Sequence, residues 1–232
     1  MTTIKNNISV IEARLQRAAS DAGRTVSEIL LLAVSKTRTS AQIDEAVAVG
    51  INSFGENYLQ EAIEKINAFP DAKLDWHFIG PLQSNKTRLI AENFAWIHSV
   101  DRLKIAQRLS DQRPPSLAPL NICLQINIDN ESTKSGFTST QALGAAFEIA
   151  RLPGIRLRGL MAIPQSRHSL EDQRAPFRRL RELKDQINEL LDNLQKLDTL
   201  SMGMSGDMEA AILEGATIVR VGTDIFGDRA AL

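Results

Sequence analysis

A lysine follows a run of apolar residues near the start of the chain. Residues 29–37 read ILLLAVSKT, so Lys36 comes just after a run of the kind that forms a buried strand. Burial favours the neutral form of an amine, and a neutral amine attacks aldehydes to form a Schiff base. Lys36 is therefore the candidate nucleophile, although an isolated lysine at a strand tip more often extends into solvent.

Two segments near the C-terminus combine glycine with hydroxyl side chains. LSMGMSGD, residues 200–207, contains Ser201, and RVGTDIFG, residues 220–227, contains Gly222 and Thr223. Glycine lets the backbone approach an anion closely, and backbone N–H groups bind phosphate oxygens where a strand leads into a helix. We therefore predict that Ser201, Gly222 and Thr223 bind a phosphate group.

An arginine interrupts the last apolar run of the chain. In TIVRV, residues 217–221, Val219 and Val221 would face helices, which directs Arg220 to the opposite face of the strand. A buried guanidinium needs an anionic or hydrogen-bond-accepting partner, and a structural ion pair with an interior carboxylate is one alternative. An amine, a phosphate site and an inward arginine together match pyridoxal 5'-phosphate (PLP). A Schiff-base sugar-phosphate aldolase would need the same lysine and phosphate site.

Eight short apolar runs, separated by segments with helical periodicity, must position these residues. The runs are residues 29–34, 51–54, 75–79, 96–100, 121–128, 155–163, 197–202 and 217–221. Strands that alternate with helices form right-handed βαβ units, and eight units in roughly 200 residues can close into a barrel. We therefore predict an α/β fold with one domain over residues 1–232, a TIM-like (β/α)8 barrel at about 29–228 preceded by an additional helix at about 3–20. An open doubly wound sheet is the alternative, but no GxGxxG turn follows the first strand.

A long helix is predicted before the seventh strand. Apolar residues recur three and four positions apart after Pro176, and proline is common in the first turn of a helix. We therefore place the start of this helix at Pro176 and interpret residues 164–173 as a surface loop.

Composition excludes several classes of function. The chain is 43% hydrophobic with a net charge of -1, which is typical of a globular protein without a basic surface for nucleic acid or anionic membranes. The single cysteine, Cys123, excludes an intrachain disulfide, and the three histidines lack metal-ligand spacing, so no metal site is predicted. No apolar run reaches the roughly 20 residues of a membrane span, and no signal peptide is evident. We expect a cytoplasmic protein.

Seven segments, in order, resemble one family from about residue 10 to residue 228. The segments LLAVSKT, FGENYLQEA, WHFIGPLQSNK, INIDNESTKSG, RGLMAIP, LSMGMSGDMEAAI and VRVGTDIFG resemble the pyridoxal phosphate homeostasis protein family. The resemblance implies a barrel like the N-terminal domain of bacterial alanine racemase, with PLP held by Lys36 as a Schiff base. Members are thought to act in vitamin B6 and amino-acid homeostasis, without a firmly assigned reaction.

The same resemblance implies roles for five further residues. Asn57 would contact the ring region of the cofactor, and Arg220 would lie near its pyridine nitrogen or its phosphate. The phosphate would be held by Ser201, Gly222 and Thr223. No catalytic residue is assigned.

The sequence lacks features that an alanine racemase needs, which favours a PLP carrier with little or no catalysis. We expect this carrier to be a monomer that exchanges PLP with apo forms of PLP-dependent enzymes. An alanine racemase needs a second domain, a partner subunit and a tyrosine base, whereas here the only tyrosine is Tyr58, interpreted as a packing residue. The alternative is a monomeric PLP-dependent racemase or decarboxylase. Lys134, in STKSG after the fifth strand, is the second candidate amine, although a solvated loop lysine is the simpler interpretation.

Overall fold

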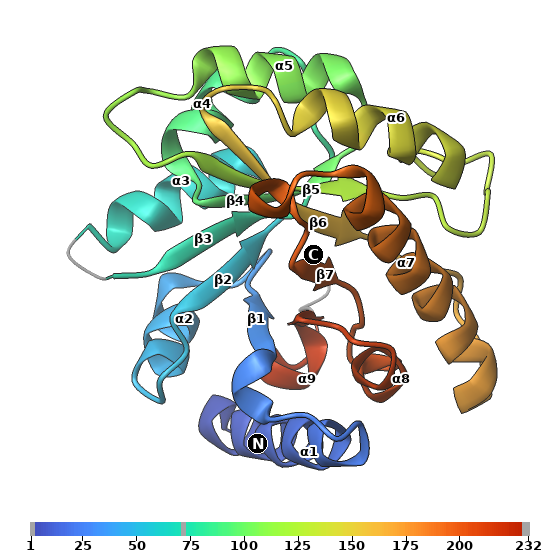
Figure 1. Cartoon of the computed structure of the whole chain (residues 1–232). Helices are drawn as coiled ribbons and strands as arrows, with labels where there is room; N and C mark the ends of the chain where they lie inside the picture. The colour runs from blue at the N-terminus through green and yellow to red at the C-terminus, as the bar shows by residue number, and fades with distance from the viewer. Residues whose placement is uncertain (1–2, 71–72, 229–232) are drawn as a thin grey trace.

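The computed structural model describes residues 3–70 and 73–228, whose eight strands form a closed parallel barrel (Figure 1). The strands are β1 (Leu30–Val34), β2 (Ser53–Glu56), β3 (Asp75–Phe78), β4 (Trp96–Val100), β5 (Leu120–Gln125), β6 (Ile155–Met161), β7 (Thr199–Ser201) and β8 (Ile218–Val221). Each strand pairs with the next along the chain, and β8 closes the barrel on β1 with Arg220 beside Leu32. The predicted (β/α)8 barrel is confirmed.

Helices surround the barrel, and most follow a strand. They are α2 (Ser40–Val47), α3 (Leu59–Ala68), α4 (Thr87–Asn93), α5 (Leu103–Gln112), α6 (Ser139–Ile149), α7 (Leu170–Leu190), α8 (Met208–Leu213) and α9 (Thr223–Phe226). Short 3-10 helices lie at η1 (Val26–Glu28) and η2 (Asn193–Gln195). None of the helices in the described residues is long and apolar enough to cross a membrane.

The additional N-terminal helix is also confirmed. It is α1 (Ile4–Asp21), and Figure 1 shows it outside the barrel next to α8 and α9, which it contacts. Apolar side chains recur three and four positions apart along one face of this helix and are buried: Ile4, Ile8, Ile11, Leu15, Ala18 and Ala19. This stripe packs the helix against the barrel. Arg14 adds ion pairs to Glu209 at 2.7 Å and to Asp224 at 2.8 Å.

The long helix α7 begins at Leu170, so the prediction that it starts at Pro176 is wrong. The Ser169 hydroxyl caps the helix by accepting a hydrogen bond from the Asp172 N–H at 3.1 Å. The acidic residues Glu171 and Asp172 lie in the first turn, where they interact favourably with the positive end of the helix dipole. This start signal places Pro176 in the helix interior and makes the end of the predicted 164–173 loop helical.

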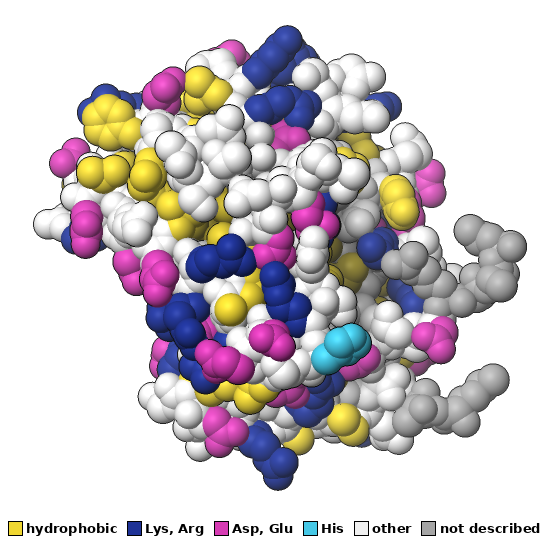
Figure 2. All heavy atoms as spheres, turned by 90° about the vertical axis from the view of Figure 1, so that its right-hand side faces the viewer, with side chains coloured by type: hydrophobic (Ala, Val, Ile, Leu, Met, Phe, Trp, Pro, Cys, Tyr) yellow, Lys and Arg dark blue, Asp and Glu magenta, His cyan; other side chains and the backbone are white. Residues whose placement is uncertain are grey.

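The face of the molecule on the α7 side mixes both signs of charge. Figure 2 shows Lys and Arg side chains interspersed with Asp and Glu across this face. Three arginines of α7 pair with the buried Glu214 that follows α8: Arg174 at 2.8 Å, Arg178 at 3.2 Å and Arg181 at 2.7 Å. These pairs tie α7 to α8, which holds the segment between β7 and β8 in place.

A glycine in β6 allows the close approach of β7. Gly159 pairs with Thr199, and a Cβ at Gly159 would lie 1.8 Å from the Thr199 carbonyl oxygen. We expect Gly159→Ala to lower the free energy of unfolding by about 3 kcal/mol or more, because the two strands must separate. Urea unfolding of Gly159→Ala and of Gly144→Ala measures this. Gly144 lies in α6 with no atom near its virtual Cβ, so Gly144→Ala should raise stability by about 0.5–1 kcal/mol. Equal stabilities would contradict this account.

Candidate functional site

A cavity of about 280 Å³ lies where the C-terminal ends of several strands meet. Its walls come from residues in or just after β1, β2, β3, β6, β7 and β8: Val34, Lys36, Asn57, Ile79, Met161, Ile163, Met204, Ser205, Gly206, Arg220, Gly222 and Thr223. Active sites of (β/α)8 barrels occupy this end of the barrel. Five of the six predicted cofactor residues thus share one cavity, and Ser201 is the exception.

Lys36 enters the cavity from a tight turn after β1. The turn spans Lys36 and Thr37, and Thr37 has a φ of 62°, in the left-handed region that β-branched residues rarely adopt. The Lys36 side chain is half-buried and lies among the cavity residues. Lys36, the candidate nucleophile predicted from the sequence, thus lies in this cavity.

Asn57 presents a buried acceptor beside this lysine. It follows β2, and its side-chain Oδ1 is buried without a hydrogen-bond partner among the described residues. An unsatisfied buried acceptor is unfavourable, so a ligand that donates a hydrogen bond would be stabilised there. The Asn57 backbone is held by the segment after β3, where a Cβ on Gly80 would lie 2.1 Å from the Asn57 carbonyl oxygen.

The loops after β7 and β8 offer backbone donors to the cavity. Within the part of the chain that the structure describes, no group accepts a hydrogen bond from the backbone N–H of Ser205, Gly206, Gly222 or Thr223. Gly222 packs tightly against β1, since a Cβ there would lie 3.2 Å from the Val34 carbonyl oxygen. Thr223 is exposed at the start of α9. Free N–H groups and a hydroxyl on one wall suit an anion.

Arg220 forms the inner wall of the cavity and is buried. Its guanidinium donates to Ser201 Oγ at 2.8 Å and to the Ala162 carbonyl oxygen at 3.0 Å. Burial lowers the pKa of Arg220 to about 10, partly opposed by the Asp207 carboxylate, so the group stays a cation at neutral pH. The predicted inward orientation of Arg220 agrees with this position. The alternative, a direct ion pair with a carboxylate, is not formed with any residue that the structure describes.

Ser201 lies beneath the cavity and not among its lining residues. It is fully buried at the end of β7, and its hydroxyl contacts Arg220 and His98. Sequence reasoning placed Ser201 at the phosphate because it looked only at the loop that follows. A direct contact between Ser201 and phosphate stays a prediction.

A chain of buried polar groups continues from Ser201 through the barrel interior. His98 Nδ1 lies 2.7 Å from Ser201 Oγ, and His98 Nε2 lies 2.9 Å from His77 Nδ1. Arginine only donates, so the Ser201 hydroxyl oxygen accepts from Arg220, while the tautomers of His98 and His77 set the direction of the two remaining hydrogen bonds. His77 is thus a hydrogen-bonded histidine of the barrel interior. His98 was missed, although its place in the apolar run 96–100 was a usable signal.

The two histidines are held neutral, which predicts a pH dependence of stability. Burial lowers the pKa of His77 from 6.5 to about 3 and the pKa of His98 well below 6.5. On acidification, the unfolded chain takes up these protons before the folded protein does. The contribution of the two histidines to the free energy of unfolding is therefore complete above pH 6.5 and is lost as the pH falls below it. Between pH 7.5 and pH 5.5, His77 should contribute a loss of about 1.4 kcal/mol.

Urea unfolding of the wild type and of His77→Gln at these two pH values tests this expectation. The variant should lose less stability on acidification, while His168→Gln, at an exposed position, should match the wild type. An identical pH dependence in all three proteins would show that His77 is not held neutral.

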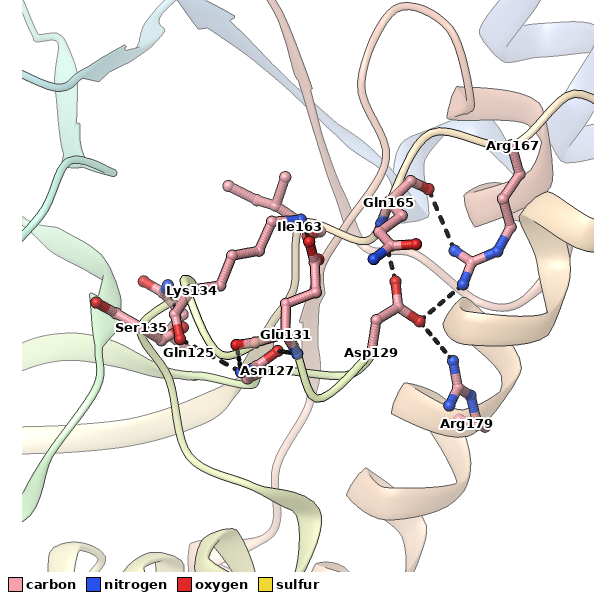
Figure 3. A network of polar contacts seen from close by, with 10 residues as sticks. All are labelled: Gln125, Asn127, Asp129, Glu131, Lys134, Ser135, Ile163, Gln165, Arg167 and Arg179. Carbon is pink, nitrogen blue, oxygen red and sulfur yellow. Dashed lines mark hydrogen bonds and ion pairs between the residues drawn. The ribbon is translucent and has the colours of Figure 1, made fainter.

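Lys134, the second candidate amine, lies at a neighbouring cavity. Its Nζ is 2.5 Å from Glu131 Oε1 and donates to the Ile163 carbonyl oxygen at 3.2 Å, as Figure 3 shows. That cavity of about 440 Å³ shares Asn57, Ile79 and Ile163 with the Lys36 cavity. Lys134 is exposed, so the interpretation as a solvated loop lysine holds, with two partners added.

The cavity also contains apolar residues that sequence reasoning did not assign. Ile79 follows β3, Met161 ends β6, and Ile163 and Met204 lie in the loops after β6 and β7. A position just after each strand's C-terminal end was the available signal, because a barrel brings these ends together. They give the site apolar walls suited to a ring.

Comparison with known proteins finds a matching family model, similar curated proteins and similar solved structures. Residues 4–230 match the family model described as alanine racemase, N-terminal domain. The pyridoxal phosphate homeostasis protein of Pseudomonas aeruginosa is 56% identical over 229 residues, which cover 99% of this chain and 97% of that protein. The structure of PipY from Synechococcus elongatus with PLP bound is 33% identical with a TM-score of 0.84, covering 97% of this chain and 100% of PipY.

A more distant likeness concerns the fold alone. Alanine racemase from Clostridium difficile is 15% identical with a TM-score of 0.74, and the match covers 97% of this chain but 58% of the racemase. The likeness thus extends over little more than half of the racemase.

Proposed function

Because the chain belongs to the pyridoxal phosphate homeostasis protein family, which shares the alanine racemase N-terminal domain, we propose that it binds PLP as a Schiff base on Lys36. The observation that supports this most is the shared cavity. Lys36 lies in one wall, the partnerless Asn57 Oδ1 borders it, and the free N–H groups after β7 and β8 form another wall. The lysine suits the aldehyde of PLP, the Asn57 acceptor suits its ring and the N–H groups suit its phosphate. The volume of the cavity suits one small ring.

Each cavity residue has a separate role in this proposal. When bound, PLP supplies an aldehyde that condenses with amines and a ring that withdraws electrons. Lys36 would hold the aldehyde end, and Gly222 and Thr223 would hold the phosphate through N–H and hydroxyl donors. Arg220, fixed by Ser201, keeps a positive charge on the inner wall, which disfavours protonation of a nearby ring nitrogen. A cofactor bound in this way would be a weak electron acceptor.

We further propose that the protein carries PLP and does not turn over amino acids. Within the described residues, the only titratable side chains that line the cavity are Lys36 and Arg220. A racemase needs a second base on the opposite face, and an arginine is a poor base. Tyr58 is 53% exposed and lines a different cavity, so a role as the opposite-face base is unsupported. Among the described residues that line the cavity, the racemase alternative therefore lacks a second base.

A carrier would act as a monomer in the cytoplasm, delivering PLP to apo forms of PLP-dependent enzymes. The half-exposed Lys36 supports this, because an incoming amine from a partner could reach it. A sugar-phosphate aldolase is disfavoured by the family relationship, and it would purify without the absorption band of a PLP Schiff base.

Deuterium exchange tests the absence of turnover. PLP-loaded protein is incubated in deuterated water with each amino acid in turn, and exchange at Cα is measured by NMR, with a true alanine racemase as the positive control. We expect no exchange above the rate of free PLP. Exchange of any amino acid well above that rate would establish catalysis and overturn the carrier proposal.

A further inference from the structure

Three charged side chains lie next to the Lys36 turn without lining its cavity. Lys65 and Glu61 are one turn apart on α3, and Glu56 ends β2. Glu56 is fully buried and Lys65 nearly so, whereas the Glu61 side chain is 28% exposed. Lys65 Nζ lies 2.7 Å from Glu56 Oε1 and 2.5 Å from Glu61 Oε1. Buried charges need close pairing, and the charge cluster pairs Glu56 through Oε1, whereas Glu56 Oε2 has no hydrogen-bond partner among the described residues.

The charge cluster holds the residue before Lys36. Lys65 Nζ donates a third hydrogen bond, to the Ser35 carbonyl oxygen at 2.6 Å. The Ser35 hydroxyl donates to Glu56 Oε1 at 2.6 Å. All three donors of the ammonium group are thereby used, one of them on the backbone adjoining Lys36.

The charge cluster also holds the residue after Lys36. The Thr37 N–H donates to Glu61 Oε1 at 2.5 Å, and the same oxygen accepts from Lys65. Thr37 has the left-handed φ of 62°. A β-branched residue adopts this conformation only when its surroundings impose it, and a charge-assisted hydrogen bond to its N–H does so.

We propose that Glu56, Glu61 and Lys65 are positioning residues for Lys36, fixing the backbone on both sides so that its amine stays in the cavity. This inference rests on the proposed function of Lys36 in PLP binding. The competing explanation is an ion-pair cluster that only joins α3 to β2. The two explanations predict different behaviour of the Lys36 turn in variants that still fold.

Glu61 offers the sharpest variants, because its side chain is part-exposed and its loss leaves Lys65 paired with Glu56. Glu61→Ala removes the acceptor of the Thr37 N–H, whereas Glu61→Gln keeps a carbonyl oxygen there. Glu64→Ala, on the exposed face of the same helix, is the matched control. Lys65→Met combined with Glu56→Gln removes both buried charges together, so no uncompensated charge remains in the core.

Two measurements are made on folded protein. The first is amide hydrogen exchange of the peptide containing residues 35–38 in the cofactor-free protein. The second is the affinity for PLP, which is monitored through the rate of borohydride trapping. We expect Glu61→Ala to exchange about tenfold faster and bind PLP about tenfold more weakly, as one lost charge-assisted hydrogen bond predicts. Glu61→Gln should recover most of both, and Glu64→Ala should match the wild type.

The double variant should resemble Glu61→Ala in both measurements, because it removes the bond to the Ser35 carbonyl. If Glu61→Ala and the double variant lower the melting temperature but leave turn exchange and PLP affinity unchanged, the cluster is structural only and the inference is wrong. If the wild type itself fails to bind PLP, the proposed function fails. The exchange measurement then still decides whether the charge cluster holds the turn.

Discussion

Replacing Lys36 by alanine is expected to abolish the PLP Schiff base while leaving the protein folded. Lys36 is the only lysine among the described cavity residues, so no other amine in that cavity can replace it. The visible absorption band of PLP-loaded protein should disappear in Lys36→Ala, and borohydride should no longer fix the cofactor. We expect residual PLP binding through the phosphate end, about tenfold to a hundredfold weaker, because one covalent contact is lost and the others remain.

Lys134→Ala is the matched control for this experiment. Lys134 lines the neighbouring cavity and is already held by Glu131, so its removal should leave the band and the borohydride reaction intact. A band that persists in Lys36→Ala but is lost in Lys134→Ala would move the cofactor to the neighbouring cavity.

Pyridoxal without its phosphate should bind at least about a hundredfold more weakly than PLP. Two or more charge-assisted hydrogen bonds from the loops after β7 and β8 would be lost, each worth about 1.5–3 kcal/mol. Gly222→Val should remove most of this preference, because a side chain there meets the Val34 carbonyl oxygen at 3.2 Å and displaces the loop. Equilibrium titrations of the cofactor-free protein with PLP and pyridoxal measure both effects.

Thr223→Val separates the hydroxyl from the backbone donors. It keeps the size of the side chain and the N–H, so the PLP preference should fall only about tenfold, the value of one hydrogen bond. Similar affinities of the wild type for pyridoxal and PLP would mean that the anion site after β8 has been assigned wrongly.

The fold could be predicted from the sequence because strand and helix signals agree along the whole chain. Apolar runs such as 96–100 became strands with the expected bounds, and helical stripes such as that of α1 became buried faces. The start of α7 could not be predicted from Pro176, because the stronger signal lay upstream in the Ser169 cap. Local capping chemistry outweighed the positional preference of proline.

From the sequence, only those site residues that lie beside recognisable strand ends could be predicted. Lys36, Gly222 and Thr223 follow strands directly, so barrel closure alone brings them together. The contact of Ser201 with Arg220, and the contact of Lys65 with Ser35, depend on side-chain directions across different strands and helices. No spacing in the sequence encodes such contacts, since they arise only when the barrel closes.

Peptide mapping of the borohydride-reduced protein tests the central claim most directly. Wild-type protein is loaded with PLP, reduced, digested and analysed by mass spectrometry for the phosphopyridoxyl group on each lysine. We predict one modified lysine, Lys36, in the peptide that contains LLAVSKT. Modification of Lys134 or of another lysine in place of Lys36, or no modification at all, would contradict the proposed function.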